Sequence, residues 1–570
     1  MDVAEDRNAQ AGSVPGPSRG PYDGPVTATD SIAGLRGAVE GAARTLHESD
    51  PTEPRPTLER PPKPELGDYS SNAAMLLARH LSDNPRTVAE RLRGELETDA
   101  GLAPNLERIE VAGPGFVNFF LADGWYLGAL GDLLAAGEDL GPAPTETPEK
   151  VLVEFVSANP TGPIHVGTGR HAAYGDSLVR LLDAVGHEVR REYYVNDAGT
   201  QIDRFAESIA ARMRAEEPPA DGYAGAYVTE LAERLKAEDV DPGDLETLRS
   251  RAVELMLDGM RETLARFGVR FDDFFSERSL YEKGEVDTAL ADLEKRGHTY
   301  RSEDALWLRT TGFGDDKDRV LIRSNGEATY FTPDIAYHWD KLQRGFDRLI
   351  DVLGADHHGY VARIRAAIEA LGGDPDAFEV PIMSLVHVIE GGERVQMSKR
   401  TGDFITLDEL LDDIGIDATR WFMLWRSHET TVDLDLEVAR SQSSENPVYY
   451  VQYAHARIAG ILRKAGEEGG TDPAAPAERL PLQESEKLLV KRLLEFPEEV
   501  RTAAARRAPH RICAYSTAVA ADFHAFYRDC QVVGAEGEGV EASRLALCLA
   551  TKRTIAAALG LLGISAPERM

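Results

Sequence analysis

Two short segments carry residue types that can bind and activate a phosphate-containing substrate. The first, residues 157–170, reads SANPTGPIHVGTGR; an apolar run precedes it at 151–156, and a helical pattern follows at about 172–185. This order predicts a strand, a glycine-containing turn and a helix, which places backbone N–H groups and a helix N-terminus where phosphates can lie. His165 can donate hydrogen bonds to phosphate oxygens, and the glycines nearby allow close approach of the backbone.

The second segment, residues 396–402, reads QMSKRTG. It places Lys399 and Arg400 in a loop that contains serine and glycine, where cations can stabilise charge that develops on a departing pyrophosphate.

A dinucleotide-binding turn is the alternative for the first segment. The pair Gly167 and Gly169 has no third glycine in register, which disfavours that alternative.

Several longer words of the sequence occur in a fixed order. They are EFVSANPTGP at 154–163, YYVNDAG at 193–199, FTPDIAY at 331–337, GADHHGY at 354–360, ENPVYYVQYAH at 445–455 and APERM at 566–570. On these words the chain resembles the arginyl-tRNA synthetases of class I, whose nucleotide motifs are written His-Ile-Gly-His and Lys-Met-Ser-Lys-Ser. The resemblance runs from about residue 30 to the last residue. Thr168 replaces the second histidine of the first motif, and Gln396 replaces the first lysine of the second.

The resemblance implies an ATP-dependent ligase that joins L-arginine to its tRNA through an arginyl-adenylate, releasing pyrophosphate and AMP. Its partners would be that tRNA, L-arginine and ATP, and tRNA would have to bind before the adenylate forms. Mg²⁺ would enter with ATP as substrate, and no protein-bound metal or organic cofactor is expected. We further expect a cytoplasmic monomer with no membrane partner.

The resemblance also assigns roles by position. The expected catalytic residues are His165 and Lys399. The expected ATP-binding residues are Pro163, His165, Gly167, Thr168, Gly354, Asp356, Met397, Ser398, Lys399 and Arg400. The expected arginine-binding residues are Glu154, Ser157, Asn159, His165, Tyr330, Asp334 and His357. The expected tRNA-binding residues are Asn446, Tyr450, Tyr453, Arg457 and Met570.

Three of these positions have a simpler interpretation. Glu154, at the end of an apolar strand, could face solvent. Asp334 could be only a helix N-cap, since Pro333 disfavours helix before it, although a planar carboxylate also suits a guanidinium. The adjacent His357 and His358 could suggest a metal, but they lack an i, i+4 histidine partner or a neighbouring cysteine.

The pattern of elements predicts an α/β fold with a Rossmann-like parallel sheet, an N-terminal α+β domain and an all-α C-terminal domain. The strands expected in the sheet lie at 151–156, 188–194, 305–309, 320–323, 348–354 and 380–388. The expected units are a disordered tail at 1–27, a tRNA-contacting domain at 28–125, a catalytic domain at 126–425 with a helical insertion at about 203–297, and a helical anticodon-binding domain at 426–570. The three cysteines, Cys513, Cys530 and Cys548, are expected as buried thiols.

The composition is strongly acidic. The net charge is −34, and only 12 of the 63 basic residues are lysine. This balance is typical of a cytoplasmic protein of a salt-loving organism, because high salt screens the self-repulsion, and we expect a halophilic archaeon as the source. Any RNA contact must then be local and arginine-rich, and residues 501–511, which hold four arginines, are one candidate.

Two other functions stay open. One is another class I synthetase, of the glutaminyl, glutamyl or cysteinyl type. The other is a synthetase-like RNA-binding protein without charging activity, which Thr168 and Gln396 suggest. The Tyr330–Asp334 pair and the polar helix at 446–455 favour the arginyl type.

Overall fold

The structure is a computed structural model that describes residues 31–47, 56–395, 404–467 and 480–570. The expected tail at 1–27 lies outside the described residues. So do Gln396, Met397, Ser398, Lys399 and Arg400 of the second motif. In the described part of the chain, no helix combines the length and apolar character needed to cross a membrane.

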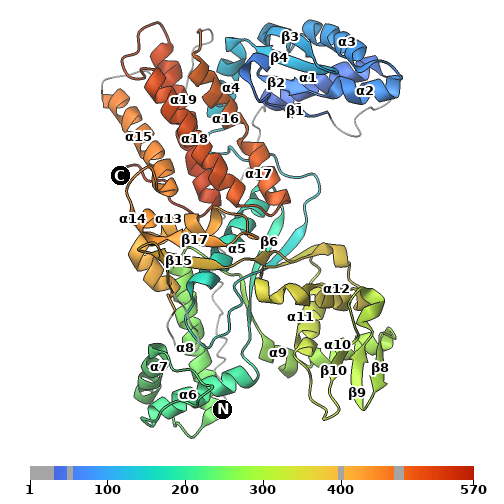
Figure 1. Ribbon diagram of the computed structural model, residues 1–570, viewed down its shortest axis with the longest axis vertical. Coiled ribbons are helices and arrows are strands. Elements are labelled where there is room, and N and C mark those ends of the chain that lie inside the picture. The colour runs from blue at the N-terminus through green and yellow to red at the C-terminus, as the bar shows by residue number, and fades with distance from the viewer. Residues whose placement is uncertain (1–30, 48–55, 396–403, 468–479) are drawn as a thin grey trace, which may run out of the picture.

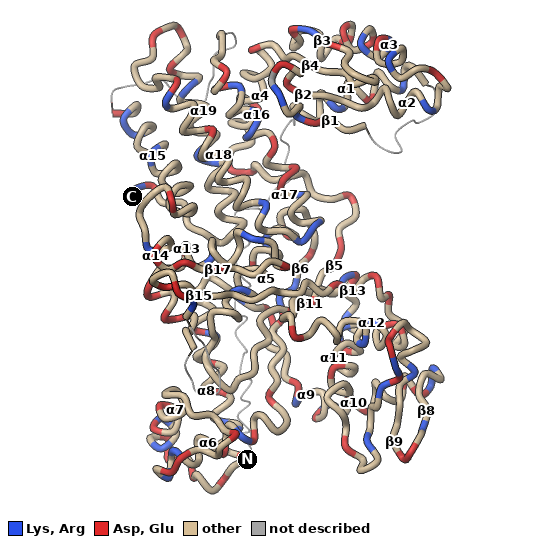
Figure 2. Tube along the Cα trace, in the orientation of Figure 1, with Lys and Arg blue, Asp and Glu red and all other residues tan. Residues whose placement is uncertain are grey.

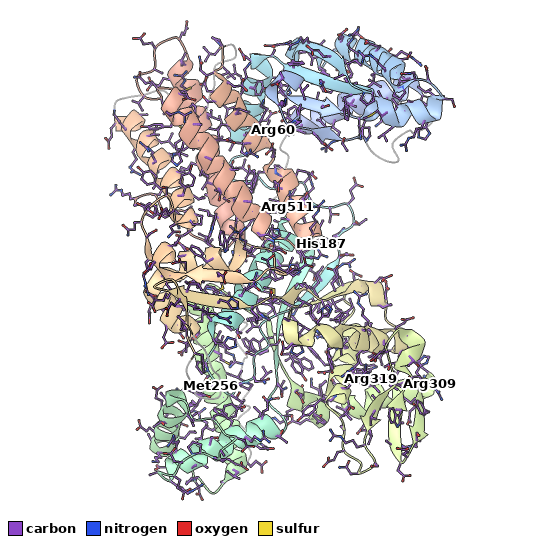
Figure 3. The ribbon with its side chains drawn as sticks, viewed as in Figure 1. Arg60, His187, Met256, Arg309, Arg319 and Arg511 are labelled. Atoms are coloured by element: carbon purple, nitrogen blue, oxygen red, sulfur yellow. The ribbon has the colours of Figure 1, made fainter. Side chains whose placement is uncertain are left out.

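The N-terminal unit is an antiparallel sheet packed against helices (Figure 1). Its strands run in the order β1-β2-β4-β3, and the unit comprises β1 (Leu58–Glu59), β2 (Tyr69–Ser71), β3 (Leu106–Ala112), β4 (Phe116–Leu121), α1 (Ser31–Leu46), α2 (Ala73–Leu81) and α3 (Pro85–Thr98). Side chains of this unit pair with α16 (Glu484–Leu494) and the residue after it, and Figure 3 labels one of them, Arg60, near this junction. Lys491 Nζ lies 2.8 Å from Asp68 Oδ1, and Arg60 Nη1 lies 2.7 Å from Glu495 Oε1.

The centre of the molecule is a five-stranded parallel sheet in the order β13-β11-β5-β6-β7. The strands are β5 (Lys150–Glu154), β6 (Glu188–Val195), β7 (Asp273–Ser276), β11 (Arg348–Asp351) and β13 (Phe378–Glu379). Helix α5 (Val166–Ala184) packs closely against the end of β5. A Cβ at Gly175 would lie 2.2 Å from the ring of Phe155, the residue that follows this strand. The predicted α/β fold with a parallel sheet is confirmed.

Three predicted members of that sheet are elsewhere. The strands expected at 305–309 and 320–323 are β9 (Ala305–Leu308) and β10 (Arg319–Ile322), which join β8 (Thr299–Ser302) in a separate antiparallel sheet. Only Glu303 and Asp304 connect β8 to β9, both with positive φ (52° and 59°). A two-residue turn of this kind joins antiparallel neighbours, whereas a parallel crossover needs a dozen or more residues. The expected strand at 380–388 lies outside the central sheet as well. It is divided into β14 (Ile382–Met383), which pairs with β12 (Leu353–Gly354), and β15 (Val386–Glu390), which pairs with β16 (Glu393–Arg394) and β17 (Val432–Asp435).

The predicted insertion at about 203–297 is helical over most of its length. It contains most of α6 (Thr200–Met213) and all of α7 (Ala226–Ala237), α8 (Leu245–Arg266) and α10 (Glu285–Lys295). It also contains β7, which returns to the central sheet and forms its edge beside β6. The segment therefore supplies a strand to the central sheet, and α9 (Glu277–Glu282) starts directly after that strand.

The C-terminal region is an assembly of helices that stands on the central sheet (Figure 1). It comprises α15 (Pro447–Glu467), α16, α17 (Phe496–Ala505), α18 (His510–Asp529) and α19 (Val540–Leu561). Cys513, Cys530 and Cys548 are buried free thiols, as predicted. The proposed basic patch at 501–511 is largely neutralised, because Arg507 pairs with Glu379 at 2.8 Å and Arg511 with Glu499 at 2.8 Å.

One buried guanidinium joins four parts of the fold. Arg420 of α13 (Leu407–Leu424) is fully buried; its Nε donates to Leu562 O (2.7 Å), its Nη1 to Phe267 O (3.0 Å) and its Nη2 to Asp176 Oδ2 (2.5 Å). These partners belong to α5, to the residue that follows α8 and to the segment after α19. Arg420 thereby fixes the helix after the second motif against the helix of the first.

Replacing Arg420 with methionine is expected to lower the free energy of unfolding by about 3 kcal/mol, because a buried carboxylate and two buried carbonyls lose their donor. Asp176 keeps Arg180 at 2.8 Å, which limits the loss. The measurement is denaturant unfolding followed by circular dichroism. Arg528→Met, which removes an exposed pair with Asp529, is the control and is expected to change stability by less than about 0.5 kcal/mol. Equal stability of the two variants would contradict the role given to Arg420.

Candidate active site

A cavity of about 1210 Å³ opens at the carboxyl ends of the central strands. It is lined by every described residue of the expected ATP-binding and arginine-binding sets: Glu154, Ser157, Asn159, Pro163, His165, Gly167, Thr168, Tyr330, Asp334, Gly354, Asp356 and His357. Ligands of open α/β sheets bind at this edge of the sheet. The structure thus brings together residues that lie up to about 200 positions apart in the sequence.

The chain turns sharply where β5 ends. Val156 and Ser157 both have positive φ (71° and 38°), a conformation that costs energy for a β-branched residue. The turn brings the Ser157 hydroxyl onto Glu154, where Ser157 Oγ donates to Glu154 Oε1 (2.8 Å) and accepts from Tyr194 N (3.1 Å). Glu154 is 7% exposed and points into the cavity, which excludes the solvent-facing interpretation. Asn159 is exposed at the rim, and its amide donates to Gln201 Oε1 (2.7 Å).

The first motif forms the N-terminus of α5. His165 is the N-cap, and its Nδ1 accepts from Gly167 N (3.1 Å) and Thr168 N (3.3 Å). These donors place the ring proton on Nε2, which lies 3.1 Å from Thr168 Oγ1. His165 therefore presents an N–H group to the cavity from a fixed ring. Thr168, in the position of the missing histidine, contributes a hydroxyl beside that group.

The segment after the second motif pairs with the first motif. Val166 N donates to Ile405 O (3.1 Å), and Leu407 N donates to Ile164 O (2.7 Å). A capping box follows, in which Thr406 and Glu409 satisfy each other's backbone N–H groups at the start of α13. Val395 and Phe404, the described residues on either side of 396–403, both line the cavity.

Asp334 lies in the first turn of α11 (Phe331–Gln343). The N-cap of this helix is Tyr330, so Asp334 is not the cap, and Pro333 is tolerated inside the first turn rather than preceding the helix. The Tyr360 hydroxyl donates to Asp334 Oδ2, and burial raises the pKa of Asp334. Tyr330 is 75% exposed at the cavity rim.

The sequence did not predict one further carboxylate that lies near Asp334 in this cavity. Glu277, the first residue of α9, is 9% exposed and lines the cavity. Burial, together with the nearby charge of Asp334, raises the pKa of Glu277 to about 7. Asn196, with its amide oriented to donate, lies 3.1 Å from Glu277 Oε2, and Asp197 accepts from Arg278 N (3.0 Å). The segment 193–199 therefore positions α9, but no local sequence pattern identifies Glu277 itself.

The turn after β11 forms another wall. A Cβ at Gly354 would lie 2.7 Å from Asp356 Oδ1, so a side chain at 354 would displace that carboxylate. Asp356 and His357 are exposed in this turn, with His357 Nε2 3.7 Å from Asp356 Oδ2. His171, another residue that the sequence analysis missed, lines the cavity and has its pKa lowered to about 4 by burial. Among the described residues, no group of three or more His, Cys, Asp or Glu could hold a metal ion.

The residues expected to contact tRNA lie outside this cavity, on α15, just before it and at the end of the C-terminal segment. The ring of Tyr450 contacts that of His524 at a tilt of 54°, with 5.0 Å between ring centroids, and the Arg457 guanidinium lies over the rings of Tyr453 and Tyr527. Tyr453 is 39% exposed and Met570 is 54% exposed. Exposed rings beside a guanidinium can stack on unpaired bases.

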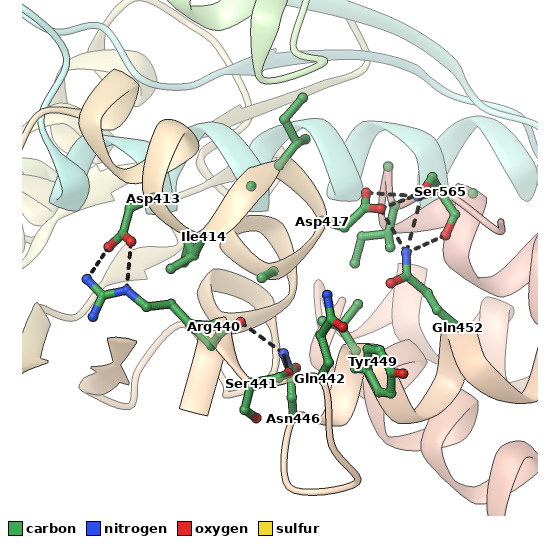
Figure 4. A pocket seen from close by; sticks show the side chains of 18 of the residues that line it. Asp413, Ile414, Asp417, Arg440, Ser441, Gln442, Asn446, Tyr449, Gln452 and Ser565 are labelled. Carbon is green, nitrogen blue, oxygen red and sulfur yellow. Dashed lines mark hydrogen bonds and ion pairs between the residues drawn. The ribbon is translucent and has the colours of Figure 1, made fainter. Parts of the chain in front are cut away.

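Asn446 differs from this group. It lines a separate cavity of about 890 Å³ between α13, α15 and the C-terminal segment (Figure 4). It is 4% exposed, and its amide nitrogen donates to Ala439 O (2.9 Å) and Ser441 O (3.0 Å). These bonds hold the loop before α15, so the structure favours a structural role for Asn446 over the expected direct contact with tRNA.

The parallel sheet, the motif turn and the cavity define the catalytic domain of a class I aminoacyl-tRNA synthetase. The family model described as "tRNA synthetases class I (R), catalytic domain" matches residues 129–433. The arginyl tRNA synthetase N terminal domain matches residues 33–121, and the DALR anticodon binding domain matches residues 451–570. The chain belongs to the arginyl-tRNA synthetase family.

Relatives and solved structures agree with that membership. The chain is 46% identical to an arginine–tRNA ligase of Shouchella clausii, covering 91% of this chain and 95% of the relative. It is 47% identical to one of Desulforudis audaxviator, covering 94% and 97%. The arginyl-tRNA synthetase of Thermus thermophilus superimposes with a TM-score of 0.73 at 27% identity, covering 94% of this chain and 100% of that one. These relatives are bacterial, so the halophilic archaeal source expected from the composition is not supported.

Proposed function

We propose that the protein activates L-arginine with ATP and transfers the arginyl group to the terminal ribose of its tRNA. The observation that carries this proposal is the pair of carboxylates, Asp334 and Glu277, in one cavity with the first-motif turn. Two carboxylates select a cationic side chain, and a guanidinium can donate to both. Glutamine, glutamate and cysteine offer no such cation, so the pair disfavours the other class I types.

In this proposal the arginine guanidinium lies between Asp334 and Glu277, and its α-ammonium group faces Glu154 and Asn159. The substrate carboxylate then attacks the α-phosphorus of ATP at the turn of the first motif, and pyrophosphate leaves. The Nε2–H of His165 donates to a phosphate oxygen, and Lys399 neutralises the leaving group. The protein supplies orientation and electrostatic stabilisation, and no covalent enzyme intermediate forms.

The proposal also covers the metal ion, the oligomeric state, the location, the adenosine site and the tRNA contact. Mg²⁺ enters with ATP, the protein acts as a monomer, and it works in the cytoplasm. The adenosine of ATP lies against the turn that holds Gly354, Asp356 and His357. The half-buried ring of Tyr450 and the exposed ring of Tyr453, together with Arg457 and Met570, contact unpaired bases of tRNA.

The proposed reaction is tested by charging total tRNA with one amino acid at a time. Arginine is expected to be esterified to tRNA, while glutamine, glutamate and cysteine are not. Charging with one of those three would transfer the assignment to another class I type. Tight binding of tRNA without charging by any of the four amino acids would favour the non-charging RNA-binding alternative.

Arginine affinity is expected to rise with pH through about 7. Burial raises the pKa of Glu277 to about 7, so below this pH Glu277 carries a proton and its pairing with a guanidinium is lost. The loss approaches tenfold in affinity for each pH unit below 7. The measurement is calorimetric binding of arginine between pH 6 and pH 8. Glu277→Gln is expected to bind weakly and without this pH dependence, and an unchanged slope in that variant would contradict the assignment.

Charging activity is expected to rise from low salt toward molar KCl before it declines. Figure 2 shows acidic positions in every part of the molecule, and the net charge of −34 repels tRNA at long range. Salt screens this repulsion over many charges, whereas the short-range arginine contacts are fewer. An ordinary basic RNA binder instead loses affinity steadily as salt rises. A steady fall of aminoacylation across the KCl series, with the circular dichroism spectrum unchanged, would contradict the expectation.

A further inference from the structure

A fully buried lysine lies beneath the cavity and belongs to none of the expected site residues. Lys341 of α11 is 0% exposed, and its Nζ lies 2.6 Å from Glu154 Oε2 and 2.8 Å from Asp351 Oδ1. Glu154 and Asp351 end the neighbouring parallel strands β5 and β11, where they are partners in register. A buried ammonium group is costly unless it is paired, and here it bridges two carboxylates that would otherwise repel each other.

The same face of α11 carries a residue for each end of the substrate. Asp334, His338 and Lys341 are spaced by four and three residues, so they lie on one side of the helix. His338 Nδ1 lies 2.8 Å from Asp334 O, and His338 Nε2 lies 3.1 Å from Asp351 Oδ2. One hydrogen-bonded chain therefore runs from Glu154 through Lys341, Asp351 and His338 to the backbone of Asp334.

The contacts of Lys341 determine what Glu154 can do. Ser157 Oγ donates to Glu154 Oε1 and Lys341 to Oε2, so both oxygens of the carboxylate are fixed before any substrate arrives. Without Lys341, two buried carboxylates at adjacent strand ends would share a proton, and such a pair does not keep both members ionised. A protonated Glu154 would be a poor acceptor for a substrate ammonium group.

We propose that Lys341 is a positioning residue that holds Glu154 ionised and oriented toward the α-ammonium group of arginine. This inference rests on the proposed function, in which Glu154 is the ligand of that group. Lys341 itself does not line the cavity and does not touch the substrate. Its effect is therefore expected on recognition of the α-ammonium end and not on recognition of the guanidinium.

The test compares two ligands that differ only at that end, L-arginine and 5-guanidinopentanoic acid, which lacks the α-amino group. Calorimetric binding to the full-length protein gives the ratio of the two affinities. Lys341→Met is expected to reduce the preference for arginine by about tenfold or more, the scale of one charge-assisted hydrogen bond. Binding of the deaminated analogue is expected to change little, and Lys341→Arg is expected to retain part of the preference.

Two further variants keep the test decisive. Lys341→Met combined with Asp351→Asn removes the repulsion left behind and guards against failure to fold; it is expected to lose the preference as well, because Glu154 loses its fixed orientation. Lys491→Met is the matched control, since Lys491 is a buried lysine paired with Asp68 far from the cavity, and it is expected to leave the ratio unchanged.

The outcomes distinguish a failure of the role proposed for Lys341 from a failure of the proposed function. If the wild-type protein prefers arginine and the folded Lys341 variants keep the full preference, the role of Lys341 is overturned while the proposed function stands. If the variants weaken both ligands equally, Lys341 is only structural, which also overturns the proposal. If the wild-type protein binds both ligands equally, the role of Glu154 fails, and the inference fails with it.

Discussion

Replacing Asp334 with asparagine is expected to weaken binding of L-arginine by about 2 kcal/mol or more, the range of a charge-assisted hydrogen bond in a buried site. Asparagine keeps the shape of the side chain, and its amide oxygen can still accept from the Tyr360 hydroxyl. The variant therefore removes the charge opposite the guanidinium with little change in packing. The KM for arginine and direct calorimetric binding both measure the effect.

The control for this variant is Asp340→Asn, on the same helix. Asp340 pairs with Arg344 at 2.8 Å and does not line the cavity. It is expected to leave the KM for arginine within about twofold of the wild type, since Asp340 lies outside the cavity and its ion-pair partner is Arg344. An unchanged KM for arginine in Asp334→Asn, with the fold intact, would remove Asp334 from the arginine site.

Replacing Lys399 with alanine is expected to slow adenylate formation by about 10²–10³-fold while arginine binding stays nearly intact. A cation that acts on the leaving pyrophosphate is more important in the transition state than in the ground state. Lys399 lies outside the described residues, but the residues that flank its segment, Val395 and Phe404, line the cavity. The measurements are arginine-dependent ATP–pyrophosphate exchange and, separately, arginine binding.

Lys317→Ala serves as the comparison for Lys399→Ala, because Lys317 is an exposed lysine outside the cavity. It is expected to leave exchange unchanged. Should Lys399→Ala lose arginine binding and exchange to the same extent, the lysine would have a structural role and the assignment of the second motif would be wrong.

The central part of the fold was predictable from the sequence because the short apolar strands are directly followed by the functional residues that they position. The run at 151–156 predicts β5, and Glu154, Ser157 and His165 follow it within a few residues. The parallel sheet then requires that strand ends meet at one edge, which brings Gly354 and Asp356 to the same cavity. The local pattern and the topology agree in this region, and the prediction succeeded there.

The antiparallel hairpin at 299–322 was missed for a physical reason. The apolar content of β9 and β10 resembles that of a buried parallel strand, and the deciding feature is the two-residue turn at Glu303 and Asp304, which carries no glycine. The alternation of strands and helices in this part of the sequence favoured a parallel sheet, and the short turn that indicates an antiparallel pair was not recognised. Strand β7 was missed because it lies in a segment that is otherwise helical.

The missed site residues share another cause. Glu277 and Lys341 act through partners that are distant in sequence, at 196 and at 154 and 351, and neither stands in a local motif. Asn446 shows the opposite case, since a polar residue in a recognisable word is used to hold a loop. Only the three-dimensional structure shows which buried charges meet.

ATP–pyrophosphate exchange with and without tRNA tests whether the cavity activates arginine. Exchange is expected to require arginine, not to be supported by glutamine, glutamate or cysteine, and to appear only when tRNA for arginine is present. Absence of arginine-dependent exchange in the presence of tRNA, from a protein with an intact fold, would contradict the assignment of the cavity as the site of arginine activation.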